Sequence, residues 1–169
     1  MTTANWAIAP ERYDTPDATA LRRAYYGEVA GRYWRRPATA AEIDEGLTND
    51  GVAELAPPTG QFMVGRMDGV PAACGGVRLL DAERAELTRV FIRPAFRGTG
   101  GAALLMAALE SAATRLGARR MVLNTRLDLT EARALYTRGG YREIPAYCEG
   151  PYMEIWYGKD LIHSPGSPG

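Results

Sequence analysis

The residues of this chain whose types and spacing suggest chemistry are those of the stretch RGTGGA, Arg97 to Ala102. The stretch stands between an apolar segment that ends at Pro94 and an apolar pattern of helical period. The first N–H groups of a helix lack backbone partners, and the helix dipole makes that end positive. Small residues would let an anion approach these groups, and Arg97 adds positive charge. We therefore expect a pyrophosphate to contact the amides of Gly98, Thr99, Gly100, Gly101 and Ala102.

Other glycine-rich phosphate loops fit this stretch less well. A Walker loop requires Gly-Lys-Ser/Thr, which occurs nowhere in the chain. A dinucleotide fingerprint is formally present at Gly98, Gly100 and Ala103, but the next predicted strand, Met121 to Thr125, carries no acid for a ribose hydroxyl. Too little chain follows the loop for the second half of a doubly wound sheet. The structural alternative is that the glycines only tighten a turn.

The elements that must position this loop can be predicted from hydrophobic periodicity and from turn residues. Asp68-Gly69 favours a tight hairpin between two apolar segments, and Pro94 should end the strand before the loop. Strands alternate with helices, which predicts a single α/β or α+β domain. The predicted helices cover 18–34, 39–47, 101–116 and 128–138, and the predicted strands cover 61–67, 71–80, 85–93, 118–127 and 152–161.

Composition narrows the classes of partner. The chain has 169 residues, with 20 basic and 20 acidic side chains, so no global charge favours nucleic acid or an anionic membrane. No apolar run approaches the roughly 20 residues of a membrane span, and the amino terminus lacks the pattern of a signal peptide, so we expect a cytoplasmic location. Cys74 and Cys148 form no CxxC pair, and the single histidine is His163. We expect no metal site and two reduced cysteines.

Taken together, the motifs resemble those of the GNAT superfamily of acyl-CoA-dependent N-acetyltransferases. Arg97, Gly100 and Ala102 match its R/Q-x-x-G-x-G/A pattern, and the strand AELTRVFIRP and the segment EARALYTRGGY stand on either side, so that the resemblance runs from about residue 12 to 161. It implies one N-acetyltransferase domain over residues 1–162, followed by a disordered tail at 163–169. The implied fold is a mixed, mostly antiparallel sheet flanked by helices, with a splayed strand pair that holds acyl-CoA.

The resemblance also implies the co-substrate, acetyl-CoA, and no metal. Its pyrophosphate would lie on the loop and its pantetheine arm beside the strand at Phe91 to Arg93, where a backbone N–H between Val90 and Ile92 could polarise the thioester carbonyl. Family members often carry Asn where this chain has Thr130, so that Thr130 could bind the pantetheine arm or cap its helix. The expected cofactor contacts are Phe91, Ile92, Arg93, Arg97, Gly98, Thr99, Gly100, Gly101, Ala102, Asn124 and Thr130.

Two side chains take catalytic roles by the same resemblance. Glu86 stands where the histone-acetylating branch of the family has its general base. An attacking amine with a pKa of about 10 is protonated at neutral pH, so it needs a base to remove its proton. Tyr136 occupies the tyrosine of the family's lYxxxGF/Y signature and would protonate the leaving thiolate. The structural alternatives are an ion pair of Glu86 with Arg84 or Arg89, and a core aromatic role for Tyr136.

The acceptor side would be built from the amino-terminal helices and the segment Ile144 to Tyr152. Both are rich in aromatic residues, which favours a small amine or amino acid over a basic peptide, with contacts at Tyr25, Glu28 and Tyr33. The alternatives are a protein lysine or N-terminal acetyltransferase and a non-catalytic acyl-CoA-binding regulatory domain. The apolar final strand could also serve as the edge of a homodimer.

Overall fold

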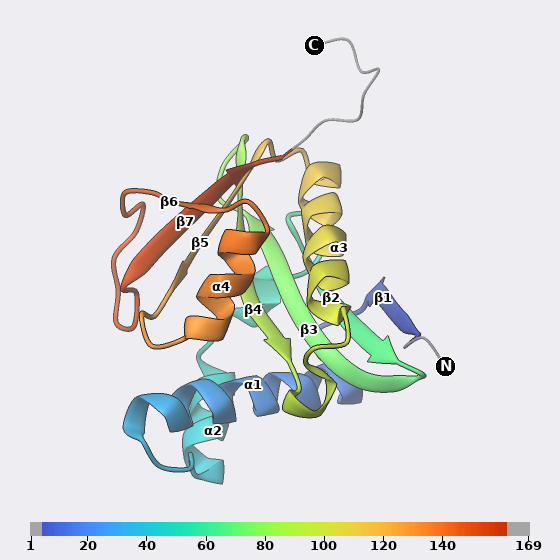
Figure 1. The fold of residues 1–169 in the computed structure, drawn as a ribbon, viewed down its shortest axis with the longest axis vertical. Coiled ribbons are helices and arrows are strands. Elements are labelled where there is room, and N and C mark those ends of the chain that lie inside the picture. The colour runs from blue at the N-terminus through green and yellow to red at the C-terminus, as the bar shows by residue number, and fades with distance from the viewer. Residues whose placement is uncertain (1–4, 162–169) are drawn as a thin grey trace.

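A computed structural model describes residues 5–161 of the chain. Its core is one mixed sheet of seven strands in the order β1-β2-β3-β4-β5-β7-β6 (Figure 1). The predicted tail at 163–169, with His163, lies outside the described residues, as do residues 1–4 and 162. The strands are β1 (Trp6–Pro10), β2 (Gly60–Met67), β3 (Val70–Leu79), β4 (Arg84–Ile92), β5 (Arg120–Thr125), β6 (Arg142–Glu143) and β7 (Ile155–Asp160).

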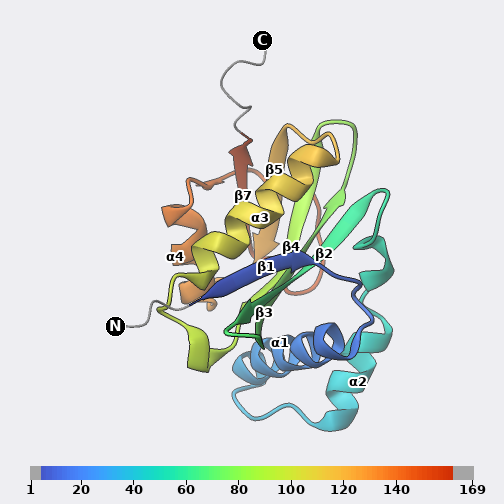
Figure 2. The same cartoon turned by 90° about the vertical axis from the view of Figure 1, so that its right-hand side faces the viewer.

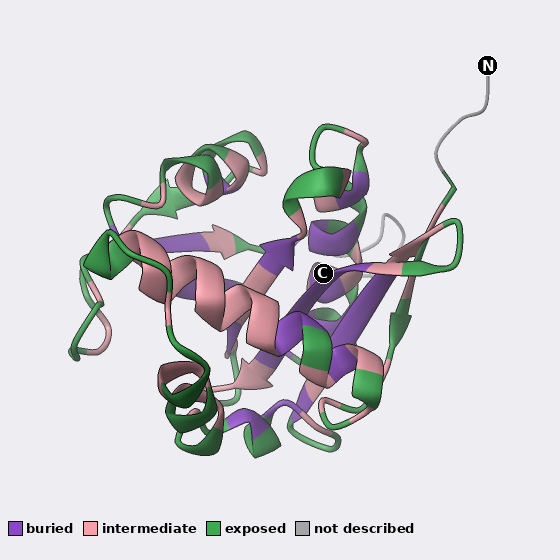
Figure 3. Cartoon of the chain, turned by 90° about the horizontal axis from the view of Figure 1, so that it is seen from below, coloured by how far each residue is buried: buried purple, intermediate pink, exposed green. Residues whose placement is uncertain are grey.

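Helices cover both faces of the sheet. Helices α3 (Gly101–Arg115) and α4 (Thr130–Arg138) lie on one face, whereas α1 (Pro16–Trp34) and α2 (Ala40–Thr48) lie on the other (Figure 2). The larger core packs α3 against the sheet, and the smaller one packs α1 and the short helix η1 (Val52–Glu54) against β2, β3 and β4. The buried residues therefore concentrate in the strands between the helices (Figure 3).

The predicted strands and helices are present, with ends shifted by a few residues. The hairpin between β2 and β3 turns at Asp68 and Gly69, both of which have positive φ. Strand β1 was not predicted from the sequence. It pairs antiparallel with β2 at the edge of the sheet, with Trp6 opposite Met67. It is short and its side chains are half-buried or exposed, so that apolar patterning gave no signal for it.

Strands β4 and β5 separate soon after they meet. They are the only parallel neighbours in the described sheet, and they pair only from Arg84 to Glu86 on β4. Beyond Glu86, β4 stays with β3 while β5 stays with β7, so that the two strands diverge. A β-bulge at Arg89, where φ is +56°, bends β4 within this unpaired part. The splayed pair that the resemblance implied is therefore present.

The last long strand, β7, is not a free edge. It pairs with β5 on one side, and the short strand β6 pairs with Tyr157 and Gly158 on the other. The Ile144 N–H also donates to the Trp156 carbonyl. The argument that the final strand offers an open edge to a second copy was thus wrong about the edge, because the chain covers it with its own β6. A homodimer itself stays a prediction.

Candidate active site

A cavity of about 940 Å³ occupies the opening between the splayed strands. Its walls come from the unpaired part of β4, the end of β5, the loop before α3, and the facing sides of α1, α3 and α4. The residues that line it therefore come from segments distant in sequence. Figure 1 shows how these strands and helices are arranged. The sequence-predicted residues that line it are Tyr25, Glu28, Phe91, Ile92, Arg97, Gly98, Gly100, Gly101, Ala102, Asn124 and Tyr136.

The amino terminus of α3 opens into this cavity without a side-chain cap. Its N-cap residue is Gly100, and no side chain accepts from the first amides of the helix. Gly98 and Gly100 have φ of +78° and +89°, and a Cβ added at either would meet no atom within 4 Å. The positive φ favours glycine at both positions, and the absence of side chains leaves open space beside the amides. This end can accept an anion.

Gly101 is small for a different reason. A Cβ added there would lie 2.2 Å from the Trp6 side chain, so the indole of β1 packs directly on the helix start. The Trp6 Nε1 donates to the Thr99 hydroxyl at 2.9 Å, and that hydroxyl donates to the Phe96 carbonyl at 2.6 Å. Thr99 does not line the cavity. Its side chain therefore anchors the loop to β1 and the short helix η2 (Pro94–Phe96).

Helix α1 is tied to both sides of the opening by ion pairs. Arg97, in the loop before α3, donates through Nη2 to both oxygens of Glu28 at 2.7 and 2.9 Å. One helical turn further on, Arg32 Nη1 donates to Glu131 at the start of α4, at 2.7 Å. The predicted cofactor arginine and the predicted substrate carboxylate are thus each other's partners, and α1 crosses the open end of the splay.

Tyr136 and Tyr25 place two buried phenols in the cavity wall. Tyr136 is packed by the rings of Tyr141 and Tyr157, at 6.0 and 6.1 Å between centroids. Burial raises the pKa of Tyr136 well above its usual value, and the nearby Tyr25 adds to this; burial likewise raises the pKa of Tyr25. No side-chain hydrogen bond to the Tyr136 hydroxyl occurs among residues 5–161. This phenol therefore stays protonated at neutral pH.

Glu86 is buried but does not line the cavity. Its Oε1 accepts from Arg78 Nε at 3.1 Å and Nη2 at 3.0 Å, and its Oε2 accepts from the Tyr147 hydroxyl at 2.7 Å. The predicted structural alternative named Arg84 or Arg89 as partner, and the observed partner is Arg78 on β3. The general-base role stays a prediction, and the contacts place Tyr147 beside it.

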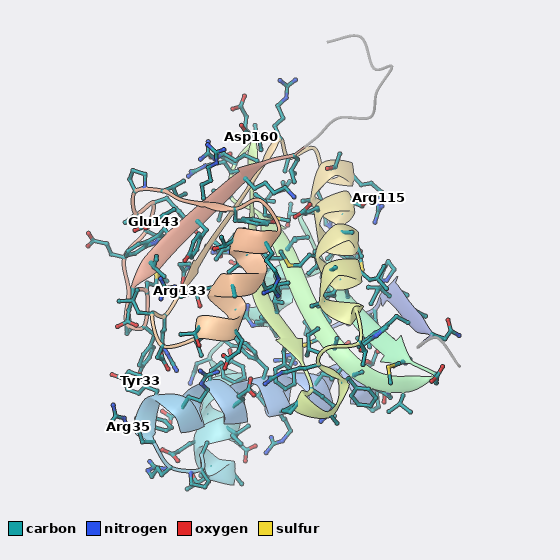
Figure 4. The ribbon with its side chains drawn as sticks, in the orientation of Figure 1. Tyr33, Arg35, Arg115, Arg133, Glu143 and Asp160 are labelled. Carbon is teal, nitrogen blue, oxygen red and sulfur yellow. The ribbon has the colours of Figure 1, made fainter. Side chains whose placement is uncertain are left out.

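Besides Thr99 and Glu86, three predicted residues lie outside the cavity lining. The Arg93 amide donates to the Ala72 carbonyl and so continues the sheet. Thr130 is exposed and is the first residue of α4, whose N-cap is Leu129 with no side-chain bond, so the capping interpretation was wrong. Tyr33 lies near the end of α1 and is half-exposed (Figure 4). Its ring centroid is 4.9 Å from that of Tyr152.

A buried charged group that was not predicted from the sequence lies behind the β4 bulge. Asp50 pairs with Arg22 Nη2 at 3.1 Å and with Arg89 Nε at 3.7 Å, and all three side chains are nearly buried. Arg89 also donates to the Asp50 carbonyl. Two arginines on one carboxylate fix the bulge against α1 and the turn at residue 50. The available signal was Arg89 itself, a charged residue directly before the apolar run VFI within a predicted strand.

Neither a metal-ligand cluster nor a membrane span is found in the part of the chain that the structure describes. Residues 5–161 contain no group of three or more His, Cys, Asp or Glu side chains placed to hold a metal ion. None of the helices in the same range combines the length and apolarity needed to cross a bilayer.

Comparisons with known proteins give a consistent result. The model of the acetyltransferase (GNAT) family matches residues 16–141. An uncharacterized N-acetyltransferase of Schizosaccharomyces pombe is 28% identical over 121 residues, which cover 70% of this chain and 74% of that protein. A Klebsiella pneumoniae structure assigned to the acyl-CoA N-acyltransferases has a TM-score of 0.71 at 26% identity and covers 93% of this chain and 98% of its own. A GNAT family acetyltransferase of Elizabethkingia anophelis with acetyl-CoA bound has a TM-score of 0.63 at 17% identity and covers 93% and 99%.

Proposed function

Because the chain belongs to the acetyltransferase (GNAT) family and is an acyltransferase, we propose that it transfers the acetyl group of acetyl-CoA to a primary amine of a small molecule or amino acid. The observation that carries this proposal is the continuity of the cavity. One space joins the uncapped start of α3, the unpaired part of β4 and the buried phenol of Tyr136. Anion binding and proton donation therefore face the same ligand.

The residues present fit acetyl-CoA. The open amides at Gly98 and Gly100 suit its pyrophosphate, because nothing lies within 4 Å of the position where a side chain would start. Arg97 is within the same wall and adds positive charge. Phe91 and Ile92 on β4 and Asn124 on β5 offer an apolar channel with a polar end for the pantetheine arm. When bound, acetyl-CoA supplies an activated acetyl thioester.

The chain's own groups can assist the transfer in three ways. A backbone N–H between Val90 and Ile92, on the part of β4 that β5 leaves unpaired, can polarise the acetyl carbonyl. Tyr136 is the candidate donor of a proton to the leaving sulfur, because its phenol is protonated at neutral pH and lines the same cavity. Glu86 is the candidate acceptor of the amine proton.

A small acceptor is favoured over a protein by the way α1 closes the opening. A lysine side chain on a polypeptide needs an open groove, whereas the pairs Glu28–Arg97 and Arg32–Glu131 join α1 to both sides of the splay. Tyr25 and Glu28 line the cavity and can contact a small amine, while Tyr33 lies outside the lining. We retain the protein acetyltransferase and the regulatory domain only as outcomes of the test.

The test is release of free CoA thiol from acetyl-CoA, measured against a panel of free amines, amino acids, and peptides with lysine or a free amino terminus. We expect thiol release with at least one free amine. Tyr136→Phe should lower kcat on the order of 10²-fold without changing the Kd of acetyl-CoA, whereas Tyr13→Phe, which removes a hydroxyl away from the cavity lining, should change neither.

Each remaining outcome contradicts part of the proposal. Turnover of peptides but of no free amine would assign the chain to the protein acetyltransferases. Binding of acetyl-CoA without thiol release in any pool would favour the regulatory domain. Full activity of Tyr136→Phe would remove Tyr136 from the mechanism.

A further inference from the structure

Glu86 is placed at the point where the two strands part, but its carboxylate is held away from the cavity. It is the last β4 residue that pairs with β5, opposite Val122. Its side chain is 10% exposed and Arg78 occupies one of its oxygens. A buried carboxylate with a fixed partner cannot swing toward a substrate without breaking that ion pair. If Glu86 accepts a proton from the amine, another group has to carry it there.

Tyr147 links this carboxylate to the cavity wall through Asn124, although Tyr147 itself is not one of the lining residues. Its hydroxyl donates to Glu86 Oε2 at 2.7 Å. The Tyr147 hydroxyl oxygen accepts from Asn124 Nδ2 at 3.5 Å. Asn124 lines the cavity and lies two residues beyond the last β5 residue that pairs with β4. The three side chains therefore form one row from the buried carboxylate to the wall, although they come from β4, from β5 and from the segment between β6 and β7.

We propose that Tyr147 relays the acceptor's proton to Glu86, an inference that rests on the proposed function. As the amine loses its proton, the N–H bond breaks and an O–H bond forms at the Tyr147 hydroxyl. The original Tyr147 O–H bond breaks at the same time, and its proton forms an O–H bond at Glu86 Oε2. The amine becomes neutral, Tyr147 is unchanged and Glu86 becomes a carboxylic acid. No other reactant is needed.

The surroundings of Tyr147 suit a relay. Burial and the hydrogen bond to Glu86 raise the pKa of Tyr147 far above its usual value, so that the phenol holds a proton to pass on. Charge-assisted hydrogen bonds of this kind are short and strong, which favours transfer along them. The ionisable groups that face the pair are Arg78 on β3, the Arg84 guanidinium at 5.9 Å from the Tyr147 ring, Cys148, and Glu54 through Arg78.

The segment that carries Tyr147 is held at both ends. The Ile144 N–H donates to the Trp156 carbonyl at 2.9 Å, and the Glu154 N–H donates to the Thr125 carbonyl at 3.0 Å. The Glu154 carboxylate also accepts from the Leu127 amide at 3.0 Å. The hydroxyl is thus positioned by a segment anchored to β5 and β7, as a group that transfers protons must be.

The experiment compares two small amines that need no dedicated acceptor pocket. Methylamine is protonated at neutral pH and needs a base, whereas hydroxylamine is already neutral. With saturating acetyl-CoA, thiol release is measured across pH for the wild type, Tyr147→Phe, Glu86→Gln and the double variant, after subtraction of the uncatalysed rate. The Kd of acetyl-CoA and the Tm of each variant are recorded, and Tyr13→Phe serves as the control for loss of a hydroxyl.

The relay predicts that each single variant lowers kcat/KM for methylamine on the order of 10²-fold. The double variant should be no slower than either single variant, because both changes interrupt the same transfer. With hydroxylamine, kcat/KM of the same variants should fall no more than about twofold, because its attack needs no prior deprotonation. The Kd of acetyl-CoA should not change.

Three results would overturn the relay. The first is a wild-type rate with methylamine in Tyr147→Phe, and the second is a double variant in which the two single losses multiply. The third is an equal loss of rate with both amines, which would indicate a merely structural role. A wild-type protein that binds no acetyl-CoA, or that binds it and acetylates no amine, would instead overturn the proposed function and the relay with it.

Discussion

Helices α2 and α3 begin in opposite ways. At the start of α2, the Thr39 hydroxyl accepts from the Glu42 amide at 3.1 Å, and the Glu42 carboxylate accepts from the Thr39 amide at 2.9 Å. This reciprocal capping box satisfies the free amides of the helix. At the start of α3, Gly100 occupies the same position and no side chain caps the helix. The start of α3 lies in the cavity wall, and the start of α2 does not.

The difference shows where stability can be given up for binding. Helix α2 buries none of its residues, so its own ends must stabilise it. Helix α3 buries Leu105 and Leu109 completely and is held by packing, which lets its first amides go without a cap. A departure from the local rule for helix starts thus coincides with the proposed ligand site.

The largest expected effect comes from giving α3 the cap that it lacks. Gly100→Asp places a carboxylate at the helix start, where it accepts from the free amides and repels pyrophosphate. Asp tolerates positive φ better than most residues. We expect the Kd of acetyl-CoA to rise about 100-fold, which corresponds to roughly 2.7 kcal/mol. Calorimetric titration measures it. Gly100→Asn separates shape from charge, and equal Kd values for Gly100→Asp and the wild type would contradict the anion site.

Removing the cap from α2 should lower stability and leave acetyl-CoA binding unchanged. Thr39→Ala leaves the amides of α2 without their acceptor and should lower the free energy of unfolding by about 1 kcal/mol. Urea denaturation measures this loss. The Kd of acetyl-CoA should stay unchanged, because α2 contributes nothing to the cavity wall. A weakened Kd in this variant would mean that the two helix starts are coupled and that the comparison between them fails.

A smaller effect tests the ion pair beside the α3 start. Glu28 holds Arg97 through two hydrogen bonds, and pyrophosphate would compete for the same guanidinium. Glu28→Gln removes the competing charge, so the Kd of acetyl-CoA should fall about threefold, in the range expected of a partly exposed ion pair. Glu131→Gln breaks the matching pair with Arg32 and is the control. A weaker Kd in Glu28→Gln would show that the carboxylate positions Arg97 for the ligand.

The smallest effect concerns acid stability at the α2 start. The Arg36 guanidinium, with the Thr39 amide, lowers the pKa of Glu42 from 4.5 to about 2. A carboxyl whose pKa falls on folding stabilises the fold at any pH above its pKa in the unfolded chain. That contribution is lost as the pH falls from about 4.5 through 2. The Glu42→Gln variant should therefore lose less stability than the wild type between pH 6 and pH 3. The difference should be small, and the urea midpoints of the two proteins at each pH measure it. Equal losses would deny the pair this role.

The sequence predicted the parts of the site that depend on local chemistry. The helical period after Gly101 and the small residues before it depend on neighbours in the chain, and both are found where predicted. The reason for Gly101 could not be predicted, because the side chain that packs on it, Trp6, comes from β1, a distant strand that apolar patterning does not reveal. The hydrogen bond from Trp6 to Thr99 likewise joins residues 93 positions apart. The splay was predicted only through the resemblance to a family.

The residues proposed as acid and base show the same limit. Tyr136 was found from its motif and lies in the cavity wall. Glu86 was found from its spacing to the loop, but its partners, Arg78 and Tyr147, depend on how β3 and the β6–β7 segment pack around it. The separation of 61 positions between Glu86 and Tyr147 carries no local signal. Residues that act through a neighbour are therefore visible only in the fold.

The central claim, that the uncapped start of α3 binds the pyrophosphate of the co-substrate, is tested most directly by calorimetric titration of the wild type with CoA and with pantetheine. Pantetheine keeps the arm that would lie along β4 and lacks the pyrophosphate. Loss of the phosphate contacts should weaken binding about 100-fold or more. The account predicts clear binding of CoA and no measurable binding of pantetheine at the same concentrations. Equal affinities for the two ligands would contradict it.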